Sequence, residues 1–510
     1  MFNKKRSPFK SRNHLPVIFN ILLILILISA CVPEQKSGII ITPETTQPPT
    51  AVPGQKYAPR PHYSPGELVD YIAQTGDTLP GLAGHFNTTE KEIRQANPDI
   101  PSDATTMPPG FPMKIPIYYL PLWGSPVHIL PDEAFVNGPS LKNFNARDFV
   151  DTQPGWFKDY EDNAAGELKK GGDLVDHVAD NFSISPKLLL AILEYQTGAL
   201  TNPQMPDFNA NPYPLGYEEM LHKGVYQQLV WAANTLNNGY YGWRAGTLTI
   251  FEKRDKTLER PDPWLNAATT GLHYYFGQVY GGDNYDQTIL ENGFLQAYER
   301  LFGKYEEGEP PLIPGSLVQP PMFFPFVPNK IWAYTGGPHA GWGNGQPFAA
   351  IDFAPASIES GCAPSTEWVT AVADGVVTRS DHYRLDLDLD GDGNNRTGWV
   401  IFYLHLSGVG MPGVGSRLKA GDYVGHPSCE GGEATGTHVH IARKYNGEWV
   451  LAGGRPAFNL EGWAVHDGDG AYSGTMTNFA AVITANVNSE ADSQIKSTRN
   501  LPKNEPKPIQ

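Results

Sequence analysis

Residues 436–443 read Gly-Thr-His-Val-His-Ile-Ala-Arg and carry two histidines two positions apart. The run is typical of a β-strand, in which successive side chains point to opposite faces, so His438 and His440 share one face. Each strand residue rises about 3.3 Å, which places the two imidazoles roughly 7 Å apart along the strand. Both rings can therefore face one metal ion or one substrate atom.

Residues upstream complete a candidate metal site. The stretch 398–405 is another alternating strand, and it ends in His405. Asp352 follows the apolar run 349–351, and His339 lies in a Gly-rich segment before it. Histidines and a carboxylate near strand ends fit a zinc site with two nitrogen ligands, one oxygen ligand and an open position for water.

This constellation resembles the lysostaphin-type (LytM) zinc endopeptidases, which cut peptide bonds in peptidoglycan cross-links. The similarity covers roughly residues 329–486 and depends on the Tyr-x-His-Leu and Thr-His-x-His stretches. By that resemblance Asp352 and His440 are zinc ligands. The same resemblance makes His405 and His438 the residues that orient the attacking water and stabilise the oxyanion.

The first histidine ligand departs from the family pattern. The family usually has it four residues before the aspartate, where this chain has Phe348. We assign His339, thirteen residues before Asp352, and expect the inserted Gly/Trp/Asn segment between them to be looped out. If His339 is not a ligand, the domain is a non-cleaving binding or regulatory relative. The His-Glu-x-x-His motif of other zinc proteases does not occur in the sequence.

Length and charge limit the possible functions. A chain of 510 residues is too long for one hydrophobic core and predicts about three domains. The net charge is −16, and basic residues do not cluster beyond the first twelve positions. This charge pattern argues against nucleic acid as a partner.

The N-terminus predicts export. Basic residues precede the apolar run 18–28, and small residues then lead to Cys31. This order is typical of a signal peptide, and the run is short for a membrane-spanning helix. Ile-Ser-Ala-Cys resembles the bacterial lipobox, which implies a signal peptide at 1–31, a lipid on Cys31 and anchoring to the cell membrane. An uncleaved signal anchor is the alternative, and either one places the remaining chain outside the cytoplasm, at the cell wall.

The cysteine count fits this location. With Cys31 lipidated, Cys362 and Cys429 remain, an even number in a compartment that permits oxidation. We predict a disulfide between them, with two unpaired thiols as the alternative.

Residues 32–65 are rich in Pro, Thr and Gln and predict a disordered linker. Residues 66–118 then follow a strand, helix, helix, strand order with Gly-Asp-Thr-Leu and Ala-Asn-Pro loops. They resemble the LysM module, which binds N-acetylglucosamine-containing glycans beside these loops; a small α+β domain without a ligand is the alternative. The resemblance implies glycan contacts at Gly76, Asp77, Thr78, Leu79, Asn97 and Pro98.

Residues 119–148 read as a linker and 149–305 as a helical domain. The sequence predicts a helix over 187–196, with Ser185 as its N-cap, Pro186 in its first turn and Gly198 after its end. This helix resembles the one that carries the catalytic acid in lysozyme-like transglycosylases.

That acid is not in its usual place. The family has a glutamate directly before a serine, whereas this chain has Gln196 and Thr197, and glutamine cannot protonate a glycosidic oxygen. Glu194 lies two residues back, about 200° around the helix. We therefore expect a glycan-binding or spacer domain, with a glycosidase that uses Glu194 as the alternative. Trp231 and Trp264 are candidate sugar-stacking rings, although a core position is the more common role of a single aromatic residue.

An acidic insertion interrupts the peptidase segment. Alternating aspartates with glycine at the bend resemble an EF-hand-type calcium loop, although no glutamate stands at the twelfth position in either register. A solvated acidic hairpin is the alternative. The possible calcium ligands are Asp386, Asp388, Asp390 and Asp392.

The expected fold is multidomain α+β. It comprises a βααβ LysM module, an all-α lysozyme-like domain, a Pro-rich linker at 306–328, an antiparallel β peptidase domain at 329–486 and a disordered tail at 487–510. The resemblances together imply a zinc-dependent cell-wall hydrolase that is held on peptidoglycan by LysM.

Overall fold

The computed structural model describes residues 61–121, 123–305, 311–357 and 359–498. The chain divides into two units, residues 1–55 and 56–510, and the first lies outside the described residues. Cys31, the predicted signal peptide and nearly all of the predicted linker 32–65 also lie outside them. In the described part, every helix is too short or too polar to cross a membrane.

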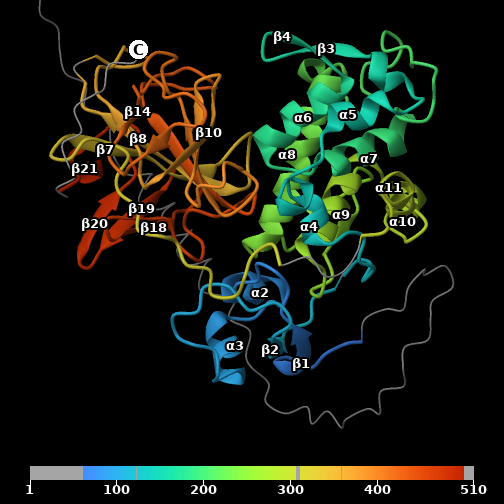
Figure 1. Ribbon diagram of the computed structural model, residues 1–510. Coiled ribbons are helices and arrows are strands. Elements are labelled where there is room, and N and C mark those ends of the chain that lie inside the picture. The colour runs from blue at the N-terminus through green and yellow to red at the C-terminus, as the bar shows by residue number, and fades with distance from the viewer. Residues whose placement is uncertain (1–60, 122, 306–310, 358, 499–510) are drawn as a thin grey trace, which may run out of the picture. The chain divides into compact units, whose positions relative to one another are not determined.

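The first described domain has the predicted βααβ order, labelled in Figure 1. Its two strands pair antiparallel, and each helix has a threonine as its N-cap. Thr78 accepts a hydrogen bond from Gly81 N, and Thr89 forms a reciprocal capping box with Glu92. The elements are β1 (Glu67–Ile72), α2 (Leu79–His85), α3 (Glu90–Ala96) and β2 (Pro112–Ile117).

A helical domain follows (Figure 1), and its buried apolar side chains form one core. The predicted helix 187–196 is α7, with Ser185 as its N-cap and Gly198 at φ +66° after its end. The helices are α4 (Asp132–Phe135), α5 (Ala146–Asp151), α6 (Gly171–Phe182), α7 (Pro186–Thr197), α8 (Val225–Arg244), α9 (Ala267–Val279), α10 (Gly282–Thr288) and α11 (Phe294–Phe302).

Two expectations for this domain need correction. Within the predicted linker 119–148, residues 129–146 belong to the helical domain, because Ile129, Phe135 and Ala146 are buried in its core. The domain is also not all-α, because it carries two short hairpins. These are β3 (Glu161–Ala164) with β4 (Glu167–Lys170), and β5 (Phe251–Glu252) with β6 (Leu258–Glu259).

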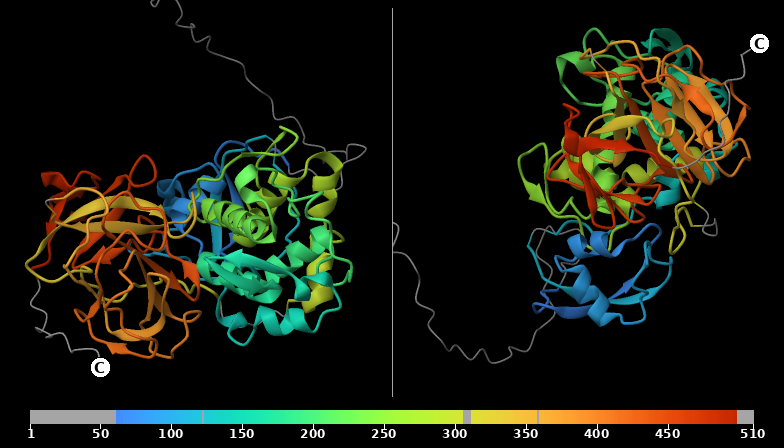
Figure 2. Two further views of the ribbon diagram at one scale, coloured as in Figure 1. Left: turned by 90° about the horizontal axis from the view of Figure 1, so that it is seen from above. Right: turned by 90° about the vertical axis from the view of Figure 1, so that its left-hand side faces the viewer.

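The third domain is built on antiparallel strands, as predicted. Its main sheet has the order β13-β10-β11-β12-β15-β8-β7-β21, with β16 beside β15. Figure 2 shows these strands in two further views. The members are β7 (Ile331–Ala340), β8 (Phe348–Pro355), β10 (Gly375–Asp381), β11 (Arg384–Asp388), β12 (Trp399–Leu404), β13 (Arg417–Leu418), β15 (Val439–Tyr445), β16 (Glu448–Trp449) and β21 (Gln494–Lys496).

Two smaller sheets complete the domain. One pairs β9 (Val369–Thr370) with β14 (Tyr423–Gly425). The other contains β17 (Asn459–Leu460), β18 (Trp463–Asp467), β19 (Gly474–Asn478) and β20 (Ala481–Thr484). The predicted disordered tail also needs correction, because within it β21 pairs with β7 and Ile495 is buried.

The helical domain packs against one face of the main sheet. Ala350, Phe402 and Ala442 stand opposite one another on neighbouring strands and belong to the same apolar cluster as the helical core. Trp449 extends the contact, since its Nε1 donates to Phe182 O at 3.1 Å. This face is also the one that carries the candidate metal ligands.

Candidate active site

One row of the main sheet holds two of the predicted ligands. His440 on β15 stands opposite Asp352 on β8, and Leu404 on β12 stands on the other side of His440. Directly opposed strand residues have Cβ atoms about 4.5–5.5 Å apart, so the register brings imidazole and carboxylate together. His440 Nδ1 lies 3.3 Å from Asp352 Oδ1.

His339 reaches the same row through a hairpin. β7 and β8 are joined by the loop 341–347, and His339 pairs with Ala350, two residues before Asp352. Register shifts flank His339 on both sides. Its Nε2 lies 3.3 Å from Asp352 Oδ1 and 3.0 Å from His440 Nδ1. The spacing of thirteen residues is therefore the length of a bulged hairpin, with the inserted segment as its loop.

Backbone carbonyls fix the ring nitrogens of both histidines. His339 Nδ1 lies 2.8 Å from Gly337 O, and His440 Nε2 lies 3.2 Å from Gly341 O. A carbonyl oxygen only accepts, so each neutral ring donates its one N–H to that carbonyl. The other ring nitrogen then carries a lone pair that faces Asp352. These tautomers leave two nitrogen lone pairs beside the carboxylate of Asp352.

The three inward atoms require a cation between them. The ligand atoms of His339, Asp352 and His440 all lie within 4.8 Å of one another, and all three side chains are buried. Asp352 Oδ1 is among the buried side-chain atoms of the described chain that have no hydrogen-bond partner. An unpaired buried charge is costly, so a proton or a metal ion must neutralise this cluster.

The pKa values also indicate that this cluster favours a positive charge. Burial by itself would raise the pKa of Asp352, but His339 and His438 outweigh burial and hold that pKa well below its usual range. Burial lowers the pKa of His440. Burial also opposes protonation of His339, yet Asp352 more than compensates and raises the pKa of that ring. The site thus favours one positive charge next to Asp352.

His405 and His438 form a separate pair beside this cluster. Their ring centroids are 4.5 Å apart. His405 Nδ1 lies 2.7 Å from Glu430 O, and His438 Nδ1 lies 2.7 Å from Gly436 O. Each ring therefore keeps Nε2 for another partner, and His438 Nε2 lies 3.8 Å from Asp352 Oδ1.

The backbone of His405 is strained. Its φ is +60°, a left-handed conformation that costs a non-glycine residue about 1–2 kcal/mol. Ser428 N donates to His405 O at 2.7 Å and helps to hold this conformation. Burial, together with the nearby His438 and His440, lowers the pKa of His405 to about 3, so the ring is neutral at physiological pH.

Two family models match the chain. The model described as "LysM domain" matches residues 71–116, and the model described as "LasA, N-terminal domain" matches residues 128–314. The second match spans the helical domain and includes residues 128–148 of the predicted linker 119–148.

Curated relatives match across a larger part of the chain. Protease LasA of Pseudomonas aeruginosa is 26% identical over 309 residues, which cover 56% of this chain and 69% of the relative. Beta-lytic metalloendopeptidase of Achromobacter lyticus is 25% identical over 189 residues, which cover 35% of this chain and 46% of the relative. The chain is a LysM-containing, LytM-like metalloendopeptidase.

Solved structures with similar segments include two peptidases. The M23 metalloprotease pseudoalterin, from the deep sea, is 24% identical, with a TM-score of 0.28, and covers 33% of this chain and 96% of its own. The catalytic domain of lysostaphin from Staphylococcus simulans is 23% identical, with a TM-score of 0.18, and covers 24% of this chain and 90% of its own.

Two residues at the site of this LytM-like peptidase were not predicted from the sequence. Tyr472 stacks on the ring of His339, with centroids 4.2 Å apart, and its N and O pair with Pro338 O and Gly337 N. A Cβ on Gly336 would lie 2.4 Å from Asp352 Oδ2, so only glycine fits there. Neither residue has a spacing signal, because both depend on register between distant strands.

The helical domain holds the loop 341–347 next to the cluster of His339, Asp352 and His440, here called the metal cluster. Asn344 N donates to Asn234 Oδ1 at 2.8 Å, and Gln346 N donates to Asn238 Oδ1 at 2.6 Å. The two asparagines are four residues apart on α8, and so they share one helix face. The peptidase loop that supplies Gly341 O to His440 is thereby fastened to α8.

The predicted disulfide between Cys362 and Cys429 is present, with Cα atoms 5.6 Å apart. It joins the loop after β8 to the loop before β15, and each of these strands carries a predicted ligand. Thr437 N also donates to Gly361 O at 3.0 Å across the same two loops. The bridge therefore restrains the segment that leads into His438.

The aspartate loop differs from the expectation. Asp386 is no calcium candidate, because it is fully buried and forms an ion pair with Arg384 at 2.5 Å. Asp388, Asp390 and Asp392 do converge, and burial raises the pKa of Asp388 to about 6. Backbone N–H groups of the loop itself bond to all three carboxylates, as in an acidic turn.

The residues expected to contact glycan divide into two groups. Gly76 and Thr78 line a cavity, whereas the Asp77 and Leu79 side chains are buried in the LysM core. Asp77 accepts a hydrogen bond from Tyr71 Oη at 2.7 Å. Asn97, next to Pro98, bonds to both backbone groups of Lys114 and so ties α3 to β2.

The helical domain offers little support for a glycosidase. Glu194 accepts hydrogen bonds from Leu200 N and from Thr201, so its carboxylate caps the loop after α7. Trp231 stacks on Tyr217 with centroids 4.6 Å apart. Trp264 Nε1 donates to Asp70 O in LysM. Each tryptophan therefore has a packing role within the protein.

Proposed function

We propose that this LytM-like protein is a zinc-dependent endopeptidase that cleaves the peptide cross-links of peptidoglycan. The observation that carries the proposal is the buried cluster of His339, Asp352 and His440. Its three facing ligand atoms are separated by 3.0 to 3.3 Å. The names of the relatives, a protease and a beta-lytic metalloendopeptidase, agree with a peptidase of this kind.

The cluster fits zinc in composition and in spacing. Two imidazole nitrogens and one carboxylate oxygen are a common ligand set for catalytic zinc, which keeps its fourth position for water. Bonds of about 2.0–2.1 Å in a tetrahedron place neighbouring ligand atoms roughly 3.3 Å apart. The carbonyls of Gly337 and Gly341 orient the two rings, as outer partners of zinc-bound histidines generally do.

His339, Asp352 and His440 would hold the zinc ion, which would supply Lewis-acid chemistry for the scissile carbonyl and for a bound water. The ring of His405 is neutral, and its Nδ1 is the atom that contacts Glu430 O. Its Nε2 can therefore accept the proton of the attacking water. His438, whose Nε2 lies on the side of Asp352, would donate a hydrogen bond to the oxyanion and so stabilise it. The proton then passes to the leaving amine.

The rest of the chain would keep this chemistry at the cell wall. The LysM match at 71–116 supports binding to the glycan strands of peptidoglycan. The N-terminal sequence supports export and a lipid on Cys31, which would anchor the protein to the outer face of the cell membrane. Glycan binding and membrane anchoring would together bring the metal site to cross-links near the membrane.

The decisive experiment measures metal content and products with the chain from residue 32 onward, beside the variant His339→Ala. We expect about one zinc per parent chain and none in the variant, because zinc needs three protein ligands. Parent enzyme should release free amines from peptidoglycan without new reducing sugars. A parent that takes up no added zinc would instead be a non-cleaving binding module. New reducing sugars would return the activity to the helical domain.

A further inference from the structure

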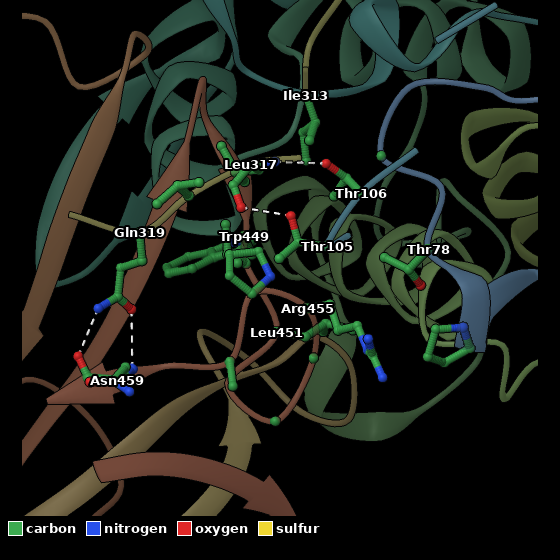
Figure 3. A pocket seen from close by; sticks show the side chains of 18 of the residues that line it. Thr78, Thr105, Thr106, Ile313, Leu317, Gln319, Trp449, Leu451, Arg455 and Asn459 are labelled. Carbon is green, nitrogen blue, oxygen red and sulfur yellow. Dashed lines mark hydrogen bonds between the residues drawn. The ribbon is translucent and has the colours of Figure 1, made fainter. Parts of the chain in front are cut away.

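A cavity of about 1120 Å³ opens at the junction of the three domains (Figure 3). Its walls come from the LysM loops 76–80 and 103–106, the connector 313–322, the end of α8 and the peptidase segment 448–467. None of the five metal-site residues lines it. Ligand sites are frequent at such domain junctions, and this volume is large enough for a ligand of several rings.

Hydrogen bonds hold the connector against LysM and keep this wall in place. Thr105 Oγ1 donates to Leu317 O at 2.7 Å, and Thr106 Oγ1 accepts from Leu317 N at 3.0 Å. Ser316 N also donates to Thr106 O at 2.8 Å. Two of these contacts are drawn in Figure 3. The connector therefore forms a fixed side of the cavity next to the LysM loops.

The charges around the cavity disfavour an anionic ligand. Arg244 is paired with Asp132 at 2.9 Å and with Glu448 at 2.8 Å. Arg455 is paired with Glu90 of LysM at 3.1 Å. Both arginines that line the cavity are thus already neutralised. Three further lining carboxylates belong to Asp103, Glu461 and Asp467.

The remaining lining alternates apolar and uncharged polar groups. Val318 is 73% exposed although it is a large hydrophobic residue, and Leu451 lines the same space. The Thr78 hydroxyl and the side-chain amide of Asn459 supply polar groups, and the amide of Gln319 is bonded to the backbone of Asn459 and holds that residue in place (Figure 3). A sugar ring has apolar faces and a rim of hydroxyls, and so it matches this mixture better than a charged or wholly apolar ligand.

We propose that this cavity binds an uncharged N-acetylhexosamine oligosaccharide, and that the connector and the peptidase domain contact it together with the LysM loops. The inference rests on the glycan-binding part of the proposed function and adds non-LysM residues to it. One glycan segment would then touch LysM on one side and the peptidase domain on the other.

The test is calorimetric binding of a β-1,4-linked N-acetylglucosamine hexamer to the chain from residue 32 onward. Val318→Asp removes an exposed apolar contact and adds negative charge, and we expect about a tenfold loss of affinity. Pro80→Arg, on the LysM wall, should also weaken binding. Val487→Asp is the matched control, because Val487 is 70% exposed and does not line the cavity. An oligogalacturonate hexamer should bind far more weakly than the neutral sugar.

Several results would overturn the inference. If Val318→Asp binds like the parent while Pro80→Arg does not, the sugar sits on LysM alone. A parent without affinity for the neutral hexamer, or with equal affinity for the anionic one, would be as damaging. Hydrolysis of a soluble cross-link peptide by the parent tests the peptidase separately. Peptide cleavage without sugar binding overturns only this inference, and sugar binding without cleavage overturns only the peptidase.

Discussion

The metal cluster and the domain junction are built in opposite ways. The cluster draws His440 and Asp352 from two paired strands, so one register fixes both. The junction depends on Arg244 of α8, which contacts Thr75 O of LysM, Asp132 of its own domain and Glu448 of the peptidase. Local strand geometry is thus sufficient for the chemistry, whereas the surroundings of the chemistry require three domains to meet.

Removing a ligand carboxylate should have the largest effect. Asp352→Asn keeps the shape of the side chain but removes the negative charge that faces both histidines. We expect zinc to be lost and hydrolysis of cross-link peptides to stop, because a neutral amide is a poor third ligand. Metal analysis and an amine-release assay check both outcomes. A zinc-loaded, active variant would contradict the assigned ligand set.

Replacing the neighbouring histidine should separate metal binding from turnover. His405→Gln removes the proton acceptor, and no atom of His405 belongs to the ligand cluster. We expect kcat to fall by about 10²–10⁴-fold with zinc content unchanged, as for loss of a general base. Loss of zinc in this variant would show that the two sets of histidines are not independent. His62→Gln, an exposed histidine outside the site, serves as the control.

The junction should respond in stability rather than in chemistry. Arg244→Met leaves the carboxylates of Asp132 and Glu448 buried without their cation, and these side chains are only 1% and 2% exposed. Breaking a buried pair on one side destabilises a protein by about 3–5 kcal/mol. Urea unfolding measures this change. Adding Glu448→Gln to Arg244→Met should recover part of the loss, and failure to recover any would argue against an electrostatic origin.

The sequence was informative wherever one element decides the outcome. Strand alternation placed His438 and His440, and the punctuation by Ser185 and Gly198 predicted α7. The LysM order was also correct. The disulfide between Cys362 and Cys429 joins two distant loops, and it was correctly predicted from the even number of cysteines left after Cys31.

Expectations failed where distant segments pack together. The segment 119–148 reads as a linker, yet Ile129, Phe135 and Ala146 within it are buried in the helical core. The tail segment 494–496 reads as disordered, yet it completes a sheet edge beside β7. Asp386 reads as a calcium ligand, since the burial of Arg384 beside it has no local signal. Tertiary contacts decide each of these cases.

The loop 341–347 links α8 of the helical domain to the cluster of His339, Asp352 and His440. Loosening this loop should lower the zinc affinity of the cluster moderately. Asn234→Ala with Asn238→Ala removes two acceptors of loop N–H groups. Outer partners of metal ligands are worth about 10–100-fold in metal affinity, and we expect the lower end because these residues act through the loop. Competition with a zinc chelator measures the change. A rise in peptidase activity instead would identify α8 as a restraint on the site.

The smallest effect should be a loss of stability at low pH, at the contact between LysM and α8. His85 stacks on Trp243 with centroids 3.5 Å apart, and its Nε2 donates to Trp243 O at 2.8 Å. Its buried Nδ1 has no partner in the described chain, so a second proton would be unsatisfied there. Burial lowers the pKa of His85 to about 3.

A depressed histidine pKa means that the unfolded chain binds more protons than the folded chain between about pH 3 and 6.5. The stabilisation is therefore complete above pH 6.5 and declines as the pH falls toward 3. Between pH 6.5 and 5 we expect His85 to account for about 1–2 kcal/mol of lost stability. His85→Gln keeps a donor for Trp243 O but does not titrate, so its thermal midpoint should fall less over this range than that of the parent. Equal pH slopes in the parent and the variant would mean that His85 takes up its proton without disturbing the contact between LysM and α8.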